Sequence, residues 1–129
     1  MTSPEEGPWT RVETMAEGQA VLVRVGGIID QDTVSTLDEG LDNGFAQAKD
    51  AGALLLAVDL HEVGLLASVG LSSLIRAHHQ AGDQGLELAV VVEPDHQLTR
   101  LLWTTALTRI LTVVPSVEEA LARAPRNPA

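Results

Sequence analysis

One serine stands where a nucleophile, a phosphate acceptor or an anion site could be built. Ser68 follows an apolar segment that is typical of a buried strand, and it precedes a helical pattern that starts at Leu71. Free backbone N–H groups and the positive end of a helix dipole gather at such a position, and Gly70 lets the backbone approach an incoming group closely. The same position is typical of a serine that only caps its helix. Ser68 is therefore either a capping residue or a phosphoacceptor or anion site.

The spacing of other residues argues against catalysis, cofactors and metals. A hydrolase nucleophile elbow has the pattern G-x-S-x-G, but Leu66 occupies the position of the first glycine. Gly26-Gly27 lacks the G-x-G-x-x-G spacing of a dinucleotide site and predicts the exit of a strand with a positive φ. None of the four histidines, His61, His78, His79 and His96, has a partner at the spacing that chelates a metal from one helix face. We expect no enzyme activity, no cofactor and no metal.

The elements before Ser68 alternate between strands and a helix. Two β-leaning runs at 9–15 and 19–25 predict a hairpin, which the two glycines end. Asp30 or Asp32 is then expected to cap a helix with one buried stripe that ends at 51–52. A continuous apolar run at 53–60 predicts a strand covered on both faces, followed by a turn at 61–64.

The elements after Ser68 continue the alternation and set the fold class. A helix ending near 82–85, a strand at 86–92, a helix around 98–105, a strand at 111–114 and a short helix at 117–124 are expected. Strands that alternate with helices form a parallel sheet through right-handed crossovers. The prediction is an α/β fold, with a mixed, mostly parallel sheet that is opened by a hairpin and covered by about four helices. We expect one domain over 9–124, a disordered lead-in at 1–8 and a frayed tail at 125–129.

Composition narrows the classes of partner. The 129 residues carry a net charge of −10, with no cysteine and 2% aromatic residues, so nucleic acid and anionic membranes would repel the chain. No apolar run is long enough to insert into a membrane and no signal peptide is visible, which predicts a cytoplasmic protein. Six acids face one lysine between Asp30 and Asp50, either as a solvated helix face or as a docking surface for a basic partner. Seven arginines against one lysine favour a GC-rich bacterial genome.

At this point the residues match a known pattern. The stretch LLLAVDLHEVGLLASVGLSSLIRAHHQA resembles the signature segment of STAS domains, the family of anti-sigma factor antagonists. That signature has an apolar strand ending in Asp-Leu, an apolar pair, Asp-Ser-Ser/Thr-Gly-Leu and a Leu-rich helix. The matching residues are Asp59-Leu60, Leu65-Leu66, Ser68, Gly70-Leu71 and Leu74. Gly27 to Asp30 and the segment from Leu88 to Leu102 resemble the family's flanking motifs, so the resemblance covers roughly 10–124.

The resemblance implies a mechanism. A STAS domain of this kind binds an anti-sigma factor, usually a serine kinase, and so frees a sigma factor. The kinase can phosphorylate a serine in the motif, and this phosphorylation dissociates the complex. The resemblance therefore implies that Ser68 is the phosphorylation site. Here Ala67 replaces the motif's aspartate and Val69 its second hydroxyl residue, so Ser68 is the only hydroxyl left in the motif. The partner is expected to contact Asp30, Ser68, Gly70, Leu71 and Ser72.

Two other functions remain open. STAS domains also serve as accessory subunits that dock on the ATPase of a membrane transporter. A flavodoxin-like enzyme is disfavoured, because no cofactor motif or acid–base cluster is present. Since a fold does not settle a function, the identity of the bound partner separates the first two alternatives.

Overall fold

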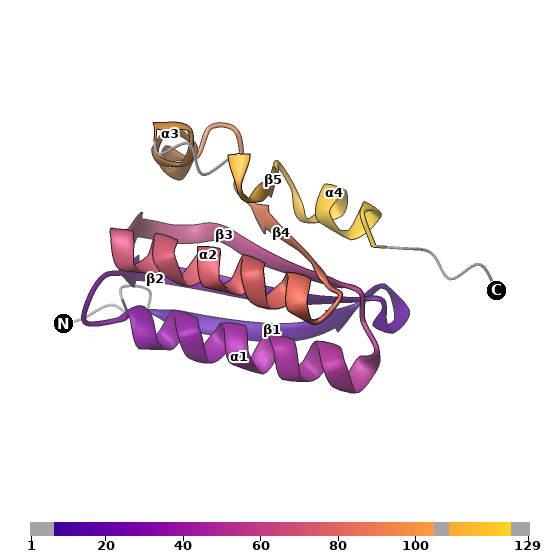
Figure 1. The fold of residues 1–129 in the computed structure, drawn as a ribbon. Coiled ribbons are helices and arrows are strands. Elements are labelled where there is room, and N and C mark those ends of the chain that lie inside the picture. Colours follow the sequence, from indigo (N-terminus) through magenta and orange to yellow (C-terminus); the bar gives the residue numbers. More distant parts are fainter. Residues whose placement is uncertain (1–6, 105–108, 125–129) are drawn as a thin grey trace.

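A five-stranded sheet runs through the molecule, and its helices lie on both faces (Figure 1). The computed structural model describes residues 7–104 and 109–124. In chain order the elements are β1 (Trp9–Met15), the 3-10 turn η2 (Ala16–Gly18), β2 (Ala20–Ile29), α1 (Val34–Ala51), β3 (Leu55–Leu66), α2 (Ser68–Asp83), β4 (Glu87–Val91), α3 (Gln97–Thr104), β5 (Thr112–Val114) and α4 (Val117–Ala122).

The sheet has the predicted mixed topology. Its strand order is β1-β2-β3-β4-β5. β1 pairs with β2 in the antiparallel sense, whereas the other three pairs are parallel. The α/β fold class, the opening hairpin and the four covering helices are therefore confirmed. Because β2 to β5 are parallel, their carboxyl ends meet at one end of the sheet, where α2 also begins.

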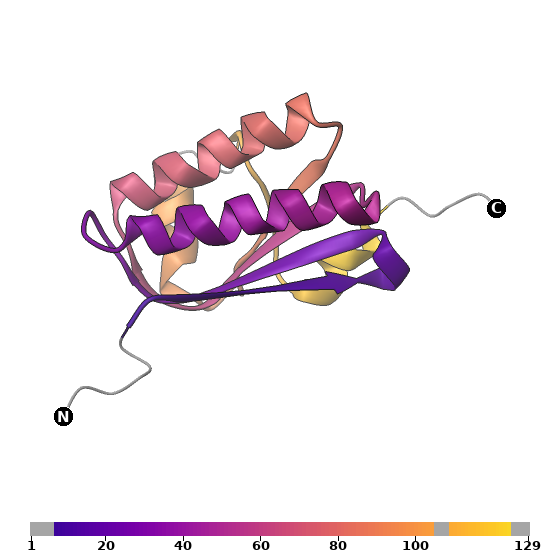
Figure 2. The same cartoon turned by 90° about the horizontal axis from the view of Figure 1, so that it is seen from below.

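Hydrophobic periodicity explains the layers. The buried stripe of α1 contains Leu37, Leu41, Phe45 and Ala48, as its helical spacing predicts, and packs with α2 and α3 against one face of the sheet. α4 covers part of the opposite face, where Ala120 packs in a smaller core. Figure 2 shows α1 and α2 on one side of the strands and α4 on the other. β3 is buried along 55–60, which confirms the strand that was expected to be covered on both faces.

Two predicted boundaries are wrong, and both errors fall at the carboxyl end of the sheet. β2 does not end at the two glycines but continues to Ile29, and β3 passes through the expected turn at 61–64 as far as Leu66. The two strands remain paired over this extension, with register shifts between Arg24 and Gly26 and between Gly27 and Ile28. Gly27 does have the expected positive φ, of 90°. Pairing between distant segments thus overrode local turn signals.

The chain termini are only partly described. Gly7 and Pro8 belong to the expected lead-in, and their backbone lies against Gly27. The rest of the lead-in, the tail at 125–129 and the predicted helical residue Thr105 lie outside the described residues. None of the helices that the structure describes is both long and apolar enough to cross a membrane.

Candidate functional site

Ser68 is the first residue of α2, not its N-cap. The N-cap is Ala67, whose methyl side chain accepts no capping hydrogen bond, so the interpretation of Ser68 as the capping residue is wrong. The Ala67 N–H donates to the Ile29 carbonyl at 2.8 Å, which ties the start of α2 to the end of β2. Ser68 is exposed, and its hydroxyl has no hydrogen-bond partner within the described residues. The hydroxyl is therefore accessible beside the free N–H groups of the first helical turn.

The structure brings the other predicted contact residues to the same end, but only some of them reach the surface. Ser72 is exposed one turn after Ser68, and Asp30 is half-buried at the end of β2. Gly70 and Leu71 are buried. A Cβ at Gly70 would lie 2.4 Å from Leu66 Cδ1, so the absence of a side chain lets the helix pack closely on the strand end. Gly70 and Leu71 therefore set the packing of the start of α2 and are not part of its exposed surface.

The carboxylate of Asp30 organises the turn that leads into α1. Its Oδ1 accepts from the backbone N–H of Asp32 at 2.9 Å, and from the N–H and hydroxyl of Thr33 at 3.1 Å each. The Asp30 N–H in turn donates to Thr33 Oγ1 at 2.8 Å. The N-cap position belongs to Thr33, so the prediction that Asp30 or Asp32 caps this helix is wrong. Asp30 accepts from the N–H groups of the turn before the helix, and Asp32 is exposed. The visible role of the Asp30 carboxylate is to hold the end of β2 next to Ser68.

Replacing Asp30 with alanine is expected to lower the free energy of unfolding by about 1–2 kcal/mol, because several backbone and hydroxyl groups lose their acceptor. Chemical denaturation followed by circular dichroism measures this change. Asp32→Ala is the matched control, since it removes an exposed carboxylate that has no hydrogen-bond partner among the described residues. Equal losses in both variants would contradict the structural role of Asp30.

Three exposed apolar side chains near Ser68 were not predicted as site residues. Ile28, Leu65 and Val69 are 45%, 48% and 36% exposed. Ile28 and Leu65 are register partners on β2 and β3, whereas their neighbours Ile29 and Leu66 point into the core. The sequence contains only two adjacent apolar pairs here, and nothing in it says which member of each pair faces outward. This end of the molecule therefore presents apolar surface in addition to a hydroxyl.

The extension of β3 beyond β4 is supported by His96, which precedes α3, and by Gln97, the first residue of α3. β3 pairs with β4 only as far as Asp59 and Val91. Further along, His96 Nε2 lies 3.1 Å from the His61 carbonyl, and the Gln97 side chain donates to the Gly64 carbonyl. The Leu98 N–H donates to His96 Nδ1, so the neutral His96 tautomer with a proton on Nε2 satisfies both contacts. Two side chains thus contact the β3 carbonyls of His61 and Gly64 where β4 no longer pairs with β3.

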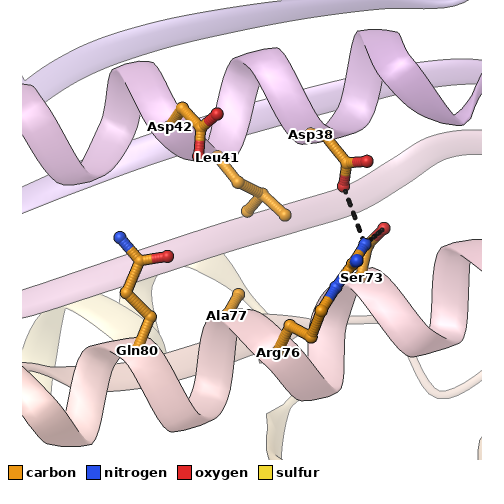
Figure 3. A pocket seen from close by; sticks show the side chains of 7 residues that line it. All are labelled: Asp38, Leu41, Asp42, Ser73, Arg76, Ala77 and Gln80. Carbon is orange, nitrogen blue, oxygen red and sulfur yellow. Dashed lines mark hydrogen bonds and ion pairs between the residues drawn. The ribbon is translucent and has the colours of Figure 1, made fainter.

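A polar groove of about 280 Å³ runs between α1 and α2. It begins more than one turn further along α2 than Ser68, and its lining includes Asp42 and Gln80. Figure 3 shows Arg76 reaching from α2 toward Asp38 on α1, with 3.6 Å between Nη2 and Oδ1. Arg76 also donates to the buried Ser73 hydroxyl at 3.0 Å. Part of the acidic run of α1 is therefore paired within the molecule.

The Ser68 hydroxyl stands apart from other polar side chains in the part of the chain that the structure describes. The exposed hydroxyl of Ser68 has no general base within hydrogen-bond reach among the described residues. In the same part of the chain, no group of three or more His, Asp or Glu side chains is arranged to hold a metal ion. This end of the molecule presents exposed apolar side chains together with the exposed hydroxyls of Ser68 and Ser72.

A family model described as the STAS domain matches residues 11–120, and the chain belongs to this family. The resemblance inferred from the sequence is therefore confirmed. A comparison with curated proteins gave no match.

Solved structures share the fold over nearly the whole chain. An anti-sigma factor antagonist from Mycobacterium paratuberculosis superposes with a TM-score of 0.78 and 25% identity, covering 96% of this chain and 98% of its own. The Bacillus cell fate determinant SpoIIAA in its phosphorylated form gives a TM-score of 0.62 at 13% identity, covering 90% of this chain and 99% of its own. Unphosphorylated SpoIIAA superposes with a TM-score of 0.61 at 11% identity, covering 88% of this chain and 94% of its own. At these lower identities the two SpoIIAA structures support the fold alone.

Proposed function

We propose that this chain is an anti-sigma factor antagonist, which binds a cognate anti-sigma factor of the serine-kinase type and so releases a sigma factor. The observation that carries the proposal is the exposed Ser68 at the start of α2, within a STAS fold similar to that of the mycobacterial antagonist. In this proposal the chain acts by binding and not by catalysis. The proposal places the chain in the cytoplasm, where a sigma factor acts.

In this proposal the partner meets the exposed residues around Ser68. Ser68, Ser72 and Val69 present the contact surface, whereas Asp30 and the buried Gly70 and Leu71 set its shape. A hydroxyl without an internal partner can face a complementary group on the anti-sigma factor with no intramolecular hydrogen bond to break.

We further propose that phosphorylation of Ser68 turns binding off. A phosphate at the first helical position is tolerated by the chain itself, because free N–H groups and the helix dipole favour negative charge there. A partner surface that fits a neutral hydroxyl and apolar neighbours would have to desolvate about two added negative charges. Two features support the proposal: the accessibility of the hydroxyl, and the lack of any other hydroxyl between Ala67 and Leu71.

Affinity capture tests the proposed partner. The tagged chain is expected to retain an anti-sigma factor with a kinase domain, identified by mass spectrometry of the bound protein. Retention of a transporter ATPase in its place would overturn the function and favour the accessory-subunit alternative. Incubation of the purified kinase with ATP should then place one phosphate on the peptide containing Ser68, and none on the Ser68→Ala variant. Phosphate at Ser72 alone would contradict the assignment of the site.

A further inference from the structure

The end of the molecule that carries Ser68 combines exposed apolar side chains with an acidic surround. We define the strand-end surface as Ile28, Leu65 and Val69 together with the exposed carboxylates of Asp32, Glu62 and Asp95. The carboxyl ends of β2 and β3, the start of α2 and the segments that follow β2 and β4 supply these residues, and they meet at one end of the sheet (Figure 1).

The apolar part of this surface is concentrated and not scattered. Ile28 and Leu65 stand side by side on neighbouring strands, and Val69 follows Leu65 across the short turn into α2. Among the described residues only two other large hydrophobic side chains are exposed, and one of them, Leu54, precedes the opposite end of β3. Exposed apolar side chains that adjoin one another, as Ile28 and Leu65 do, indicate an interaction site, whereas single exposed side chains need no explanation.

The segments that adjoin the apolar part are rich in acidic side chains. The three segments that meet here, 28–33, 61–72 and 93–97, contain five carboxylates and no lysine or arginine. Hydrogen bonds from His96 and Gln97 to the carbonyls of His61 and Gly64 hold the last two segments together. The Asp30 carboxylate is used in its turn, and the Glu93 carboxylate lies 3.0 Å from His61 Nδ1. Asp32, Glu62 and Asp95 are exposed, and of these three only Glu62 has an ion-pair contact within the described residues, at 3.8 Å from His61 Nε2.

The α1–α2 groove is a weaker candidate for the same role. Its carboxylates are offset by Arg76, which pairs with Asp38 and crosses the space between the helices (Figure 3). The segments of the strand-end surface contain no lysine or arginine, and the imidazole of His61 contacts only Glu62 and Glu93 among their carboxylates. The charges of Asp32 and Asp95 are therefore available to a partner.

We infer that the strand-end surface is the main docking face for the partner, and that the partner presents an apolar centre ringed by lysine and arginine. This inference rests on the proposed function and extends it from Ser68 to the outward face of β2 and β3. Apolar contact at the centre supplies most of the affinity, while opposite charges at the rim steer association and set the orientation.

Neutralising the acidic rim of the strand-end surface, with a matched control, tests the role of its charges. The triple variant Asp32→Asn, Glu62→Gln and Asp95→Asn is compared with Glu39→Gln, Asp50→Asn and Asp83→Asn, which removes the same charge from exposed acids on the helices. The probe is the purified protein retained in the capture experiment, titrated by calorimetry. At about 50 mM salt the first variant should bind about tenfold more weakly, and the second within about twofold of the unaltered chain. The difference should shrink at about 500 mM salt, because rim charges are screened.

Apolar truncation tests the centre. Leu65→Ser should weaken binding of the same probe by about tenfold or more, whereas Leu54→Ser should change it by less than about twofold. Leu65 lies at the carboxyl end of β3 and Leu54 immediately precedes its amino end. They are 48% and 44% exposed, so the two substitutions remove comparable exposed apolar surface. Circular dichroism melting shows whether each variant is folded. If Leu65→Ser does not fold, the two triple charge variants test the docking face.

The outcomes separate this inference from the proposed function. An anti-sigma factor that binds both triple variants equally well would overturn the docking face and leave the function standing. A transporter ATPase that discriminates between them would overturn the function and support the docking face. Equal binding by Leu65→Ser and Leu54→Ser overturns the apolar centre, and a chain that retains no protein at all overturns both proposals.

Discussion

Replacing Ser68 with aspartate should weaken binding to the captured partner by about 100-fold, since an unpaired charge would have to be buried against a surface that fits a hydroxyl. Ser68 begins α2 and is surrounded in sequence by Ala67 and Val69, which offer no polar group to pair with the new carboxylate. Isothermal titration calorimetry of the variant against the partner measures the loss.

The Ser68→Asp variant is also expected to fold normally, which makes the binding result interpretable. A carboxylate in the first turn of a helix interacts favourably with the dipole, so the melting temperature should stay the same or rise slightly. Ser68→Asn is the matched control, because it has the same shape as aspartate without the charge, and it should bind much more tightly than the aspartate variant. Unchanged affinity of Ser68→Asp would place Ser68 outside any charge-sensitive interface.

Replacing Gly27 with alanine should lower the free energy of unfolding by about 2–4 kcal/mol. Two causes add. Gly27 has a φ of +90°, which L side chains rarely adopt, and a Cβ there would lie 2.6 Å from the Gly7 carbonyl oxygen and 2.9 Å from Pro8 Cα. Both contacts are with backbone atoms, which cannot move aside as the end of a side chain can. Urea denaturation measures the change.

Two other glycines separate these causes. Gly52, at the end of α1, has a φ of +68° and open space around its Cβ position, so Gly52→Ala isolates the conformational term and should cost about 1–2 kcal/mol. Gly64 has neither a positive φ nor a neighbour within 4 Å, so Gly64→Ala should change stability by less than about 0.5 kcal/mol. A Gly27→Ala variant no less stable than Gly52→Ala would show that the Gly7–Pro8 segment is not packed against β2.

The Gly27 result bears on the candidate site as well as on stability. Gly27 lies where the register between β2 and β3 shifts, immediately before the pair Ile28–Ile29. That shift decides which isoleucine enters the core and which one is exposed beside Leu65. A side chain at Gly27 that moved the strand end would therefore alter the strand-end surface together with the stability.

The sequence alone determined the order of the elements and most of the core. Helical spacing identified the buried stripe of α1, and the continuous apolar run at 53–60 identified a strand covered on both faces, because burial on one or two faces leaves a distinct period. Ser68, as the one hydroxyl of a recognisable motif before a helix, could also be selected without coordinates.

Only the tertiary structure decided where the strands end and which side chains the site exposes. β2 and β3 continue through local turn signals because each supplies the other's hydrogen bonds, and His96 and Gln97 support the part of β3 that β4 does not reach. Ala67 takes the N-cap position that was considered for Ser68, which leaves the hydroxyl free. The outward direction of Ile28 and Leu65 depends on a register shift between segments more than thirty residues apart. Such a shift leaves no periodic trace in either segment, since a displacement by one residue exchanges the two faces of a strand.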